Sequence, residues 1–476
     1  MLRGTGMRAI ILEFNELTPA LMRRFMEMGT LPNFSKLRAE SQVFTTDAGE
    51  DPPWLEPWIQ WVTVHCGSPA SEHGIFNLGD SPSLRRPAIW DVVSSAGYPV
   101  WVCGSMNAFH SSNVNGAILP DPWSVGIRPS PVTLDPYFDF VRSQVLEYTR
   151  PKGSMGLKSA LRFAKFMASN GLTLATAGAI ASQLLRERVK ACHWQRANIL
   201  DRLQYDLFES MYCKLRPRLA TFFLNSTAHY QHVYWRNMEP NLFAEKPSMA
   251  DQNAYGSAVR FGYERMDAIV GKIMQLVDDQ TAIIFITALS QQPCLKYEGI
   301  GGKRFYKPVN VNNMLTAVGI DAGDCDIEPV MSEQFHLRFA SVGKAQEAYD
   351  KLQAVVVEGM PAFASRLNDC SIMTGCGVIR ELPPGALLRT GDRAVPFESV
   401  FYLVDLKKSG MHHRDGMAWF RIPGLAARDF DPAVSLVDLP PTILRVMGLD
   451  APESMRGRVL PFAAPIVESR PINAAA

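Results

Sequence analysis

A carboxylate lies at the predicted mouth of a helix in residues 50–75, which read EDPPWLEPWIQWVTVHCGSPASEHGI. Prolines keep the start of this stretch extended, and residues 58–66 are predicted to begin a helix behind it. Glu56 therefore stands beside a helix N-terminus, whose partial positive charge also attracts anionic ligands. Two interpretations remain open from position alone. Glu56 is either presented to a cleft, where it does acid–base chemistry, or it only stabilises the helix end.

Two more side chains have the chemistry to contact a substrate, one in an earlier predicted strand and one within this stretch. Glu13 alternates with apolar neighbours in a predicted strand. It either faces a buried partner or, close to Glu56, is an acid whose pKa is raised by burial. Trp58 belongs to a cluster with Trp54 and Trp61 that could stack a sugar or a base, although core packing is the commoner role of such a cluster.

Short apolar runs predict the strands that position these residues. Arg8–Phe14, Leu219–Leu224 and Thr281–Thr287 are typical of buried parallel strands. Asn15 directly follows the first run, at the carboxyl edge of the predicted sheet, where ligands bind in open α/β folds. It either hydrogen-bonds a ligand or forms an Asx turn. Strands separated by helices along the whole chain favour an α/β fold, with a mainly parallel sheet and helices on both faces.

Two insertions interrupt this predicted core. Residues 141–218 are mostly helical by pattern, and residues 305–398 alternate as a small α+β unit. The core then comprises residues 1–140, 219–304 and 399–476. Within the helical insertion, Phe163–Leu185 is apolar but interrupted by polar residues, which favours a buried or interfacial helix over a membrane span. This helix could dock a partner or a membrane surface.

The composition of the chain predicts which kinds of partner it binds and in which compartment it is found. A net charge of +1 over 476 residues gives no sign of binding to nucleic acid or to an anionic membrane. The eight cysteines form no CxxC pair and no regular framework, so we expect reduced thiols in a cytoplasmic protein. The first residues lead straight into a strand without the features of a signal peptide.

Several stretches, taken in order, resemble the alkaline phosphatase superfamily, in its type I phosphodiesterase/nucleotide pyrophosphatase branch. The stretches that carry this resemblance are Thr18-Pro19 after the opening strand, Leu31–Phe34, Gly67–Ile75, Ala88–Asp91 with Ala96-Gly97, Tyr230–His232 with Trp235, His412–Gly416, and Val437–Gly448 with Gly457-Arg458. The resemblance leaves out residues 140–218 and 305–398. It implies an alkaline-phosphatase-like core.

The resemblance also implies a two-metal site, usually of zinc, that clamps a phosphoryl group. Here the ligand pattern is degenerate. Asn15 stands where the family has an aspartate, and Ala228 replaces the aspartate four residues before His232. No Asp-His pair follows the third strand, where the chain has Gln291 and Gln292.

The nucleophile of the family is also missing. Its spacing lands on Pro57, beside Glu56, and the nearest hydroxyl is that of Thr63. His232 survives, and so does His412 in Met411–Gly416, a segment predicted to be a loop.

The resulting hypothesis is a hydrolase or transferase that acts on a small phosphate ester, or on an activated sugar or nucleotide, without the full two-metal site. His232 and His412 hold one zinc-class divalent metal, completed by His229 or Glu56, or no metal is bound. Glu56 is the general base or nucleophile. In the same hypothesis Asn15 and Gln291 orient the substrate, and the expected substrate contacts are Glu13, His229, Gln292 and Trp58.

Two alternatives of other classes stay open. The first is a catalytically silent relative used for binding or as a scaffold. The second is another group transfer in the same cleft, such as glycosyl transfer, in which Glu56 works with Glu13 or Asp415.

Overall fold

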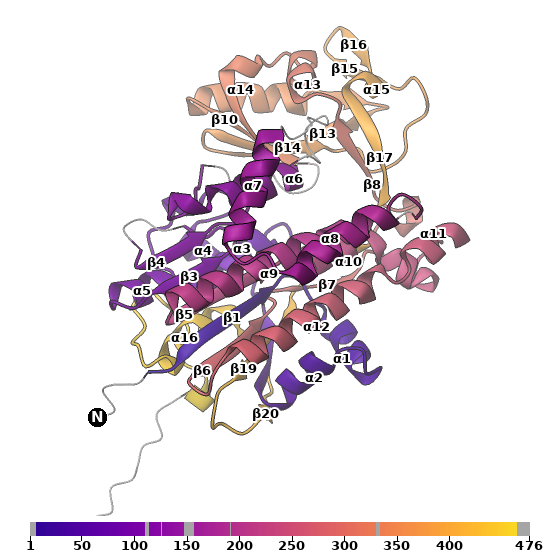
Figure 1. Ribbon diagram of the computed structural model, residues 1–476. Coiled ribbons are helices and arrows are strands. Elements are labelled where there is room, and N and C mark those ends of the chain that lie inside the picture. The colour runs from indigo at the N-terminus through magenta and orange to yellow at the C-terminus, as the bar shows by residue number, and fades with distance from the viewer. Residues whose placement is uncertain are drawn as a thin grey trace, which may run out of the picture.

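A nine-stranded sheet forms the centre of the protein in a computed structural model, which describes residues 6–109, 114–124, 126–146, 157–190, 192–329 and 334–463 (Figure 1). The strand order is β20 (Arg428–Asp429), β2 (Gln42–Asp47), β19 (Asp415–Arg421), β6 (Thr281–Ile286), β1 (Arg8–Phe14), β5 (Leu219–Leu224), β3 (Val100–Cys103) and β4 (Gly116–Leu119), and β21 (Val434–Ser435) also pairs with β2. β19 runs antiparallel to β6 and β2, whereas the other pairs are parallel. The predicted α/β class with a mainly parallel sheet is confirmed.

Helices cover both faces of this sheet because side chains alternate along each buried strand. In β1, Ile10, Leu12 and Phe14 enter one apolar core, whereas Ala9 and Ile11 enter the other. The helices on the first face are α1 (Pro19–Glu27), α2 (Pro32–Ala39), α6 (Asp135–Leu146), α9 (Arg196–Leu215), α10 (Ser226–Met238) and α12 (Ala258–Leu276). The second face is covered by α3 (Pro57–Cys66), α4 (Ala70–His73), α5 (Ile89–Ser95) and α16 (Leu439–Val446).

The helical insertion contains the end of α6, then α7 (Leu157–Ser169), α8 (Leu174–Arg186) and α9. The expectation of one helix over Phe163–Leu185 is wrong, because the chain turns between α7 and α8 at Gly171. This glycine has φ +106°, and a Cβ there would lie 2.5 Å from the backbone oxygen of Asp206 on α9. Over the described residues, we find no helix with the length and apolarity needed to span a bilayer.

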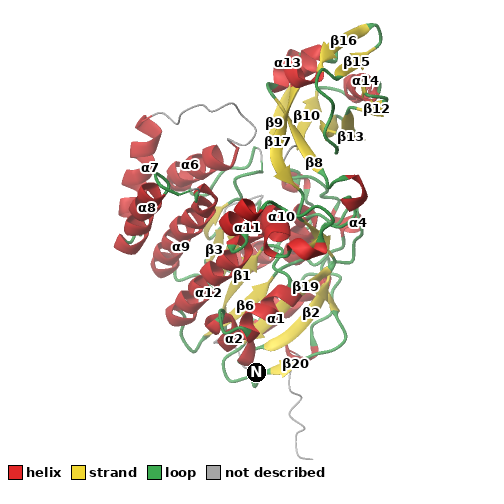
Figure 2. Ribbon diagram, turned by 90° about the vertical axis from the view of Figure 1, so that its right-hand side faces the viewer, coloured by secondary structure: helices red, strands yellow, loops and turns green. Residues whose placement is uncertain are grey.

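The α+β insertion stands at one end of the molecule and is reached through a two-stranded ribbon (Figures 1 and 2). The ribbon pairs β8 (Arg304–Pro308) with β17 (Phe401–Lys407). Between them lie α13 (Val311–Ala317), β9 (Cys325–Pro329), β10 (Gln334–Phe339), α14 (Val342–Gln353), β11 (Val356–Val357), β12 (Met360–Pro361), β13 (Phe363–Asn368), β14 (Ser371–Cys376), β15 (Leu387–Thr390), β16 (Arg393–Pro396) and α15 (Phe397–Val400). This unit has an apolar core of its own.

Side chains also tie the α+β insertion to the core near residues 50–80. A nitrogen of Arg338 lies 3.2 Å from the carboxylate of Asp80, and the guanidinium of Arg366 lies 5.1 Å from the ring centroid of Trp54. Two contacts of different kinds, one ionic and one cation–π, therefore join the insertion to two separate loops of the core.

Candidate metal centre

Glu16 lies in the turn that follows β1, at the carboxyl edge of the sheet. Its backbone has φ +60°, a left-handed conformation that is uncommon for a residue with a side chain. This turn directs the carboxylate inward, where the side chain is 2% exposed. Burial alone would raise the pKa of Glu16, but the nearby His412 and His232 rings and a hydrogen bond from Gln291 lower it to about 2. The centre therefore contains a buried carboxylate that is ionised at neutral pH.

His232 reaches this carboxylate from α10. Its Nε2 lies 2.9 Å from Glu16 Oε2, and its Nδ1 lies 3.1 Å from the backbone oxygen of Gly410. A carbonyl oxygen only accepts hydrogen bonds, so Nδ1 carries a proton.

His412 reaches the same carboxylate from β18 (Gly410–His413), a strand at a position where a loop was expected. Its Nδ1 donates to the backbone oxygen of Leu55 at 2.9 Å, and its Nε2 lies 3.5 Å from Glu16 Oε2. Burial lowers the pKa of His412 to about 4, so the ring is neutral at pH 7. A neutral ring whose Nδ1 is protonated presents the lone pair of Nε2 to Glu16.

The pairing of β18 with β7 (Ser290–Pro293) decides which neighbouring side chains join the centre. Gln291 lies directly opposite His412 in this antiparallel pair, so the two side chains share one face. Gln291 Nε2 lies 2.5 Å from Glu16 Oε2 and 3.0 Å from the backbone oxygen of Ala228. Gln292 is on the opposite face and exposed. It therefore does not join Gln291 at the centre, contrary to its expected role in binding substrate.

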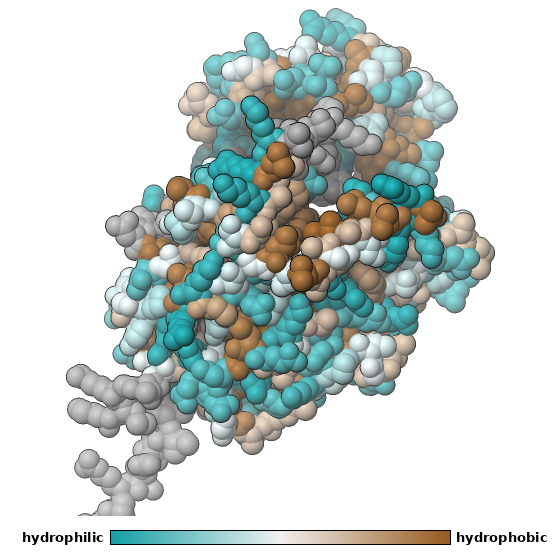
Figure 3. All heavy atoms as spheres, viewed as in Figure 1, coloured by the Kyte–Doolittle hydropathy of each residue, from teal (hydrophilic) through white to brown (hydrophobic). Residues whose placement is uncertain are grey.

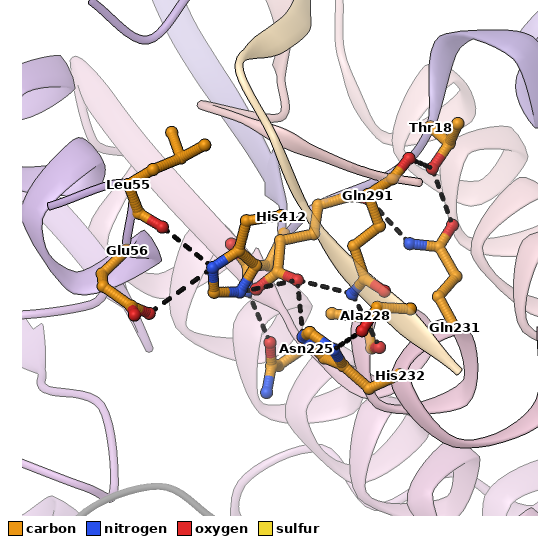
Figure 4. Close-up of polar contacts among 12 residues, drawn as sticks. Thr18, Leu55, Glu56, Asn225, Ala228, Gln231, His232, Gln291 and His412 are labelled. Carbon is orange, nitrogen blue, oxygen red and sulfur yellow. Dashed lines mark hydrogen bonds and ion pairs between the residues drawn. The ribbon is translucent and has the colours of Figure 1, made fainter. Parts of the chain in front are cut away.

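Glu16, His232 and His412 have the geometry and chemistry of a metal site. One ligand atom from each residue lies within 4.8 Å of the other two. Ligand atoms about 2.0–2.1 Å from a tetrahedral zinc are about 3.4 Å apart, close to the His412–Glu16 separation. Both rings donate Nδ1–H to backbone carbonyls, which is the usual outer partner of a metal-binding histidine. The three side chains thus fit one divalent cation. Figure 4 shows His232, His412 and Gln291 lying together, with Glu56 beside His412.

Glu56 lies beside this group without belonging to it. It is the N-cap residue of α3, its side chain makes no capping bond, and its Oε2 is 3.5 Å from His412 Nδ1. Burial raises the pKa of Glu56 to about 8, against the opposing charges of Lys408, Arg366 and Lys303. Glu56 therefore stands at the helix N-terminus, as expected. With its pKa raised to about 8, the protonated form predominates at neutral pH, and in this form Glu56 can donate a proton.

Asn15 is buried and connects Glu16 to neighbouring side chains by hydrogen bonds. Its Nδ2 donates to Glu16 Oε1 and to Asn225 Oδ1, both at 2.8 Å, and its Oδ1 accepts from Trp61 Nε1 at 2.8 Å. All the polar atoms of the side chain are occupied by protein partners. Asn15 therefore positions Glu16, and we correct the expectation that it orients substrate directly.

Two other expected site residues lie elsewhere, and so does Thr63, the hydroxyl nearest to the missing nucleophile position. Glu13 is fully buried, with Oε1 2.9 Å from His65 Nε2, so the alternative of a buried partner is the correct one. Trp58 is buried in the core and donates Nε1–H to the backbone oxygen of Phe76 at 3.0 Å. The hydroxyl of Thr63 is 3.2 Å from His73 Nε2 and buried, so it is no nucleophile.

His229 is an expected site residue that lies beside the centre, whereas Glu16 is a member of the centre that was not expected. His229 is partly buried on α10, and burial lowers its pKa to about 4, with the charges of His232 and Lys307 acting in the same direction. It belongs to the surroundings of the centre and not to the three-residue group. Glu16 was not expected in the site, because the position that the family resemblance gives to an aspartate is occupied by Asn15, one residue earlier. The available signal was a carboxylate directly after a buried strand, at the edge where ligands bind.

Comparison with known proteins shows a distant likeness to solved structures. The chain is similar to murine ectonucleotide pyrophosphatase / phosphodiesterase 5 in complex with AMP, at 12% identity and TM-score 0.42, over 94% of this chain and 96% of that chain. It is similar to phosphonoacetate hydrolase from Sinorhizobium meliloti 1021 in complex with phosphonoacetate, at 12% identity and TM-score 0.42, over 93% and 96%. No family model and no curated protein matches the sequence. A likeness at this level assigns no role to any residue.

Proposed function

We propose that the protein is a hydrolase of small phosphate esters that uses one zinc-class divalent metal, held by Glu16, His232 and His412. The observation that carries this proposal is the direction of the two imidazoles. Each ring directs Nε2 at Glu16 Oε2 while Nδ1 donates to a backbone carbonyl. In the neutral His412 ring, Nε2 and the carboxylate oxygen both present lone pairs, and a cation between them turns this repulsion into attraction.

A divalent cation at this position would polarise a phosphoryl oxygen and lower the pKa of water. The residues of the chain supply the remaining functions. Glu56 is partly exposed beside His412, and we assign to it proton transfer with the substrate. Lys408, Arg366 and Lys303 lie close enough to act on the Glu56 carboxyl by their charge. Their cationic side chains favour a substrate with negative charge, such as a phosphate ester.

Glycosyl transfer by Glu56 with Glu13 is not compatible with the position of Glu13. That alternative needs two carboxyl groups across an open cleft. Glu13 is fully buried against His65, and Asp415 is a largely exposed residue that lies 3.9 Å from His413. The catalytically silent relative stays as the rival, and it is separated by the experiment below.

The test is metal content and metal affinity of the purified protein, by elemental analysis and by titration with Zn²⁺. We expect one tightly held ion per chain in the wild type, and loss of this ion in Glu16→Gln and His412→Ala. The matched control is His413→Ala, since His413 is adjacent to His412 but on the opposite face of β18. Hydrolysis of a generic phosphodiester such as bis(p-nitrophenyl) phosphate should follow the metal.

Two results would overturn the proposal. Absence of bound metal in the wild type, even after Zn²⁺ or Mn²⁺ is added, would favour the silent relative. Equal metal loss in His413→Ala and His412→Ala would show that the ion is held elsewhere.

A further inference from the structure

Helix α8 packs Ile180 against the core, but its fully buried positions are polar and three of its leucines are exposed. Its buried residues are the polar Thr176 and Gln183, whereas Leu174, Leu184 and Leu185 are exposed. The buried polar groups are satisfied: Thr176 Oγ1 accepts a hydrogen bond from Thr173 Oγ1 at 3.0 Å, and Gln183 Nε2 donates to the backbone oxygen of Cys192 at 2.7 Å. A helix on a protein surface normally buries its apolar stripe. The exposed leucines of α8 therefore indicate a surface that contacts another molecule.

The exposed apolar side chains continue beyond α8 onto its neighbours. Figure 3 shows brown residues gathered over α7 and α8 on the face toward the viewer. We define the α7–α8 surface by its large exposed apolar residues, which are Leu161 (60% exposed), Leu174 (93%), Leu184 (52%), Leu185 (61%) and Val189 (80%). On α8 the residues between the leucines are mostly Ala, Gly and Ser, so this part of the surface has no large side chains to interrupt it.

Most charged residues in the segment that carries this surface are positive. The cations among residues 157–190 are all exposed, and they are Lys158, Arg162, Lys165, Arg186, Arg188 and Lys190. Glu187 is the only acidic residue in that range of the sequence, and its carboxylate pairs with Arg196 at 2.5 Å and with His193 at 3.3 Å. With six cations and one acidic residue, the segment 157–190 that carries the α7–α8 surface has a formal charge of +5, although the whole chain is nearly neutral.

We propose that the α7–α8 surface binds peripherally to membranes that contain anionic lipid. Exposed leucines set between lysines and arginines are the features that place a helix in the interface plane, with apolar side chains at the acyl boundary and cations among the headgroups. A second copy of the chain is a poorer occupant, since it would bring six cations against six. An acidic protein partner matches the charge, but the small residues along α8 offer no pocket for anchoring side chains.

The test is flotation of the purified full chain with vesicles of phosphatidylcholine, with or without phosphatidylglycerol. The wild type should float with the anionic vesicles, bind the neutral ones weakly, and dissociate as salt is raised. The double variant Leu184→Ser/Leu185→Ser should lose about tenfold or more in vesicle affinity. Arg188→Gln/Lys190→Gln should weaken binding to anionic vesicles and reduce its salt dependence.

The matched control is Met249→Ser/Val342→Ser, which removes two exposed apolar side chains outside this surface and should bind like the wild type. Thermal unfolding of each variant confirms that the fold is retained. Three results would overturn the proposal: no flotation of the wild type with either vesicle, equal losses in the control, or concentration-dependent dimerisation that Leu184→Ser/Leu185→Ser abolishes while vesicle binding persists.

Discussion

His412 and Gln291 lie directly opposite each other in the β7–β18 pair, and both side chains reach the same oxygen of Glu16. One presents a lone pair to that oxygen and the other donates a hydrogen bond to it. The two residues are 121 positions apart in the sequence. They come together because β7 and β18 pair as a two-stranded antiparallel ribbon. The register of this ribbon therefore controls the composition of the candidate metal centre.

Replacement of Gln291 tests whether this register is functional. In Gln291→Ala, Glu16 loses one hydrogen bond and the backbone oxygen of Ala228 loses another. Because outer partners hold metal ligands in position, we expect about 10–100-fold weaker binding of Zn²⁺ by calorimetric titration. Gln292→Ala is the matched control and should bind Zn²⁺ like the wild type, since Gln292 faces the other way. Equal losses in both variants would contradict the assigned register.

Gly410 is required by the close packing of the same ribbon. A Cβ at this position would lie 2.1 Å from Gln291 Oε1 and 2.7 Å from the backbone oxygen of Gln231. We expect Gly410→Ala to destabilise the protein by about 1–3 kcal/mol in urea unfolding and to weaken Zn²⁺ binding, because Gln291 must move. Gly343→Ala, at an open position in α14, should be neutral or slightly stabilising. A Gly410→Ala protein with wild-type stability would show that the ribbon is looser than described.

The strands at the centre of the sheet were predictable because each is a continuous apolar run. Arg8–Phe14 and Leu219–Leu224 form strands with the predicted bounds, and the third run ends one residue early, at Ile286. Burial on both faces removes the need for alternation and leaves a simple signal in the sequence. The carboxyl edge, and with it the location of the site, follows from those strands.

The composition of the site was much less predictable. Glu16 enters it through a left-handed turn, which spacing from the preceding strand does not reveal. His412 and Gln291 meet through a pairing between distant segments, and one of these had no strand pattern of its own. Glu13 and Trp58 had suitable chemistry, but each stands in an apolar stretch, in β1 and α3, and such a stretch is the same signal that marks core packing. Residue type was informative there only after the packing was known.

The buried His336 should make the stability of the α+β insertion depend on pH. His336 is buried in β10, and burial lowers its pKa from 6.5 to about 4, with the charge of Asp80 opposing this shift and those of Arg338 and Arg366 adding to it. Between pH 6.5 and pH 4, His336 is protonated in the unfolded chain but stays neutral in the folded insertion. Stability should therefore fall as the pH drops from 6.5 to 4, by at most about 3 kcal/mol from this residue.

The measurement is urea unfolding of wild type and His336→Leu at about pH 7.5 and about pH 5. The variant should lose less stability than the wild type between the two pH values. His413→Leu is the control, because His413 is exposed and should leave the wild-type pH dependence in place. The assignment fails if both variants show the same dependence as the wild type.

Lys408 tests the role of positive charge in recognising the substrate. Its backbone N–H donates to the backbone oxygen of Lys303 at 3.0 Å, next to the β8–β17 ribbon, and its charge acts on Glu56. Because the cation is close to Glu56 without being a metal ligand, Lys408→Gln should raise KM for an anionic phosphodiester about tenfold, which corresponds to about 1.4 kcal/mol, and change kcat less. The difference from the wild type should shrink as salt is added. Lys351→Gln removes an exposed cation paired with Glu347 on α14 and should leave KM unchanged. If Lys408→Gln lowers kcat with no change in KM, Lys408 acts on the reaction itself, and substrate binding depends on other cations.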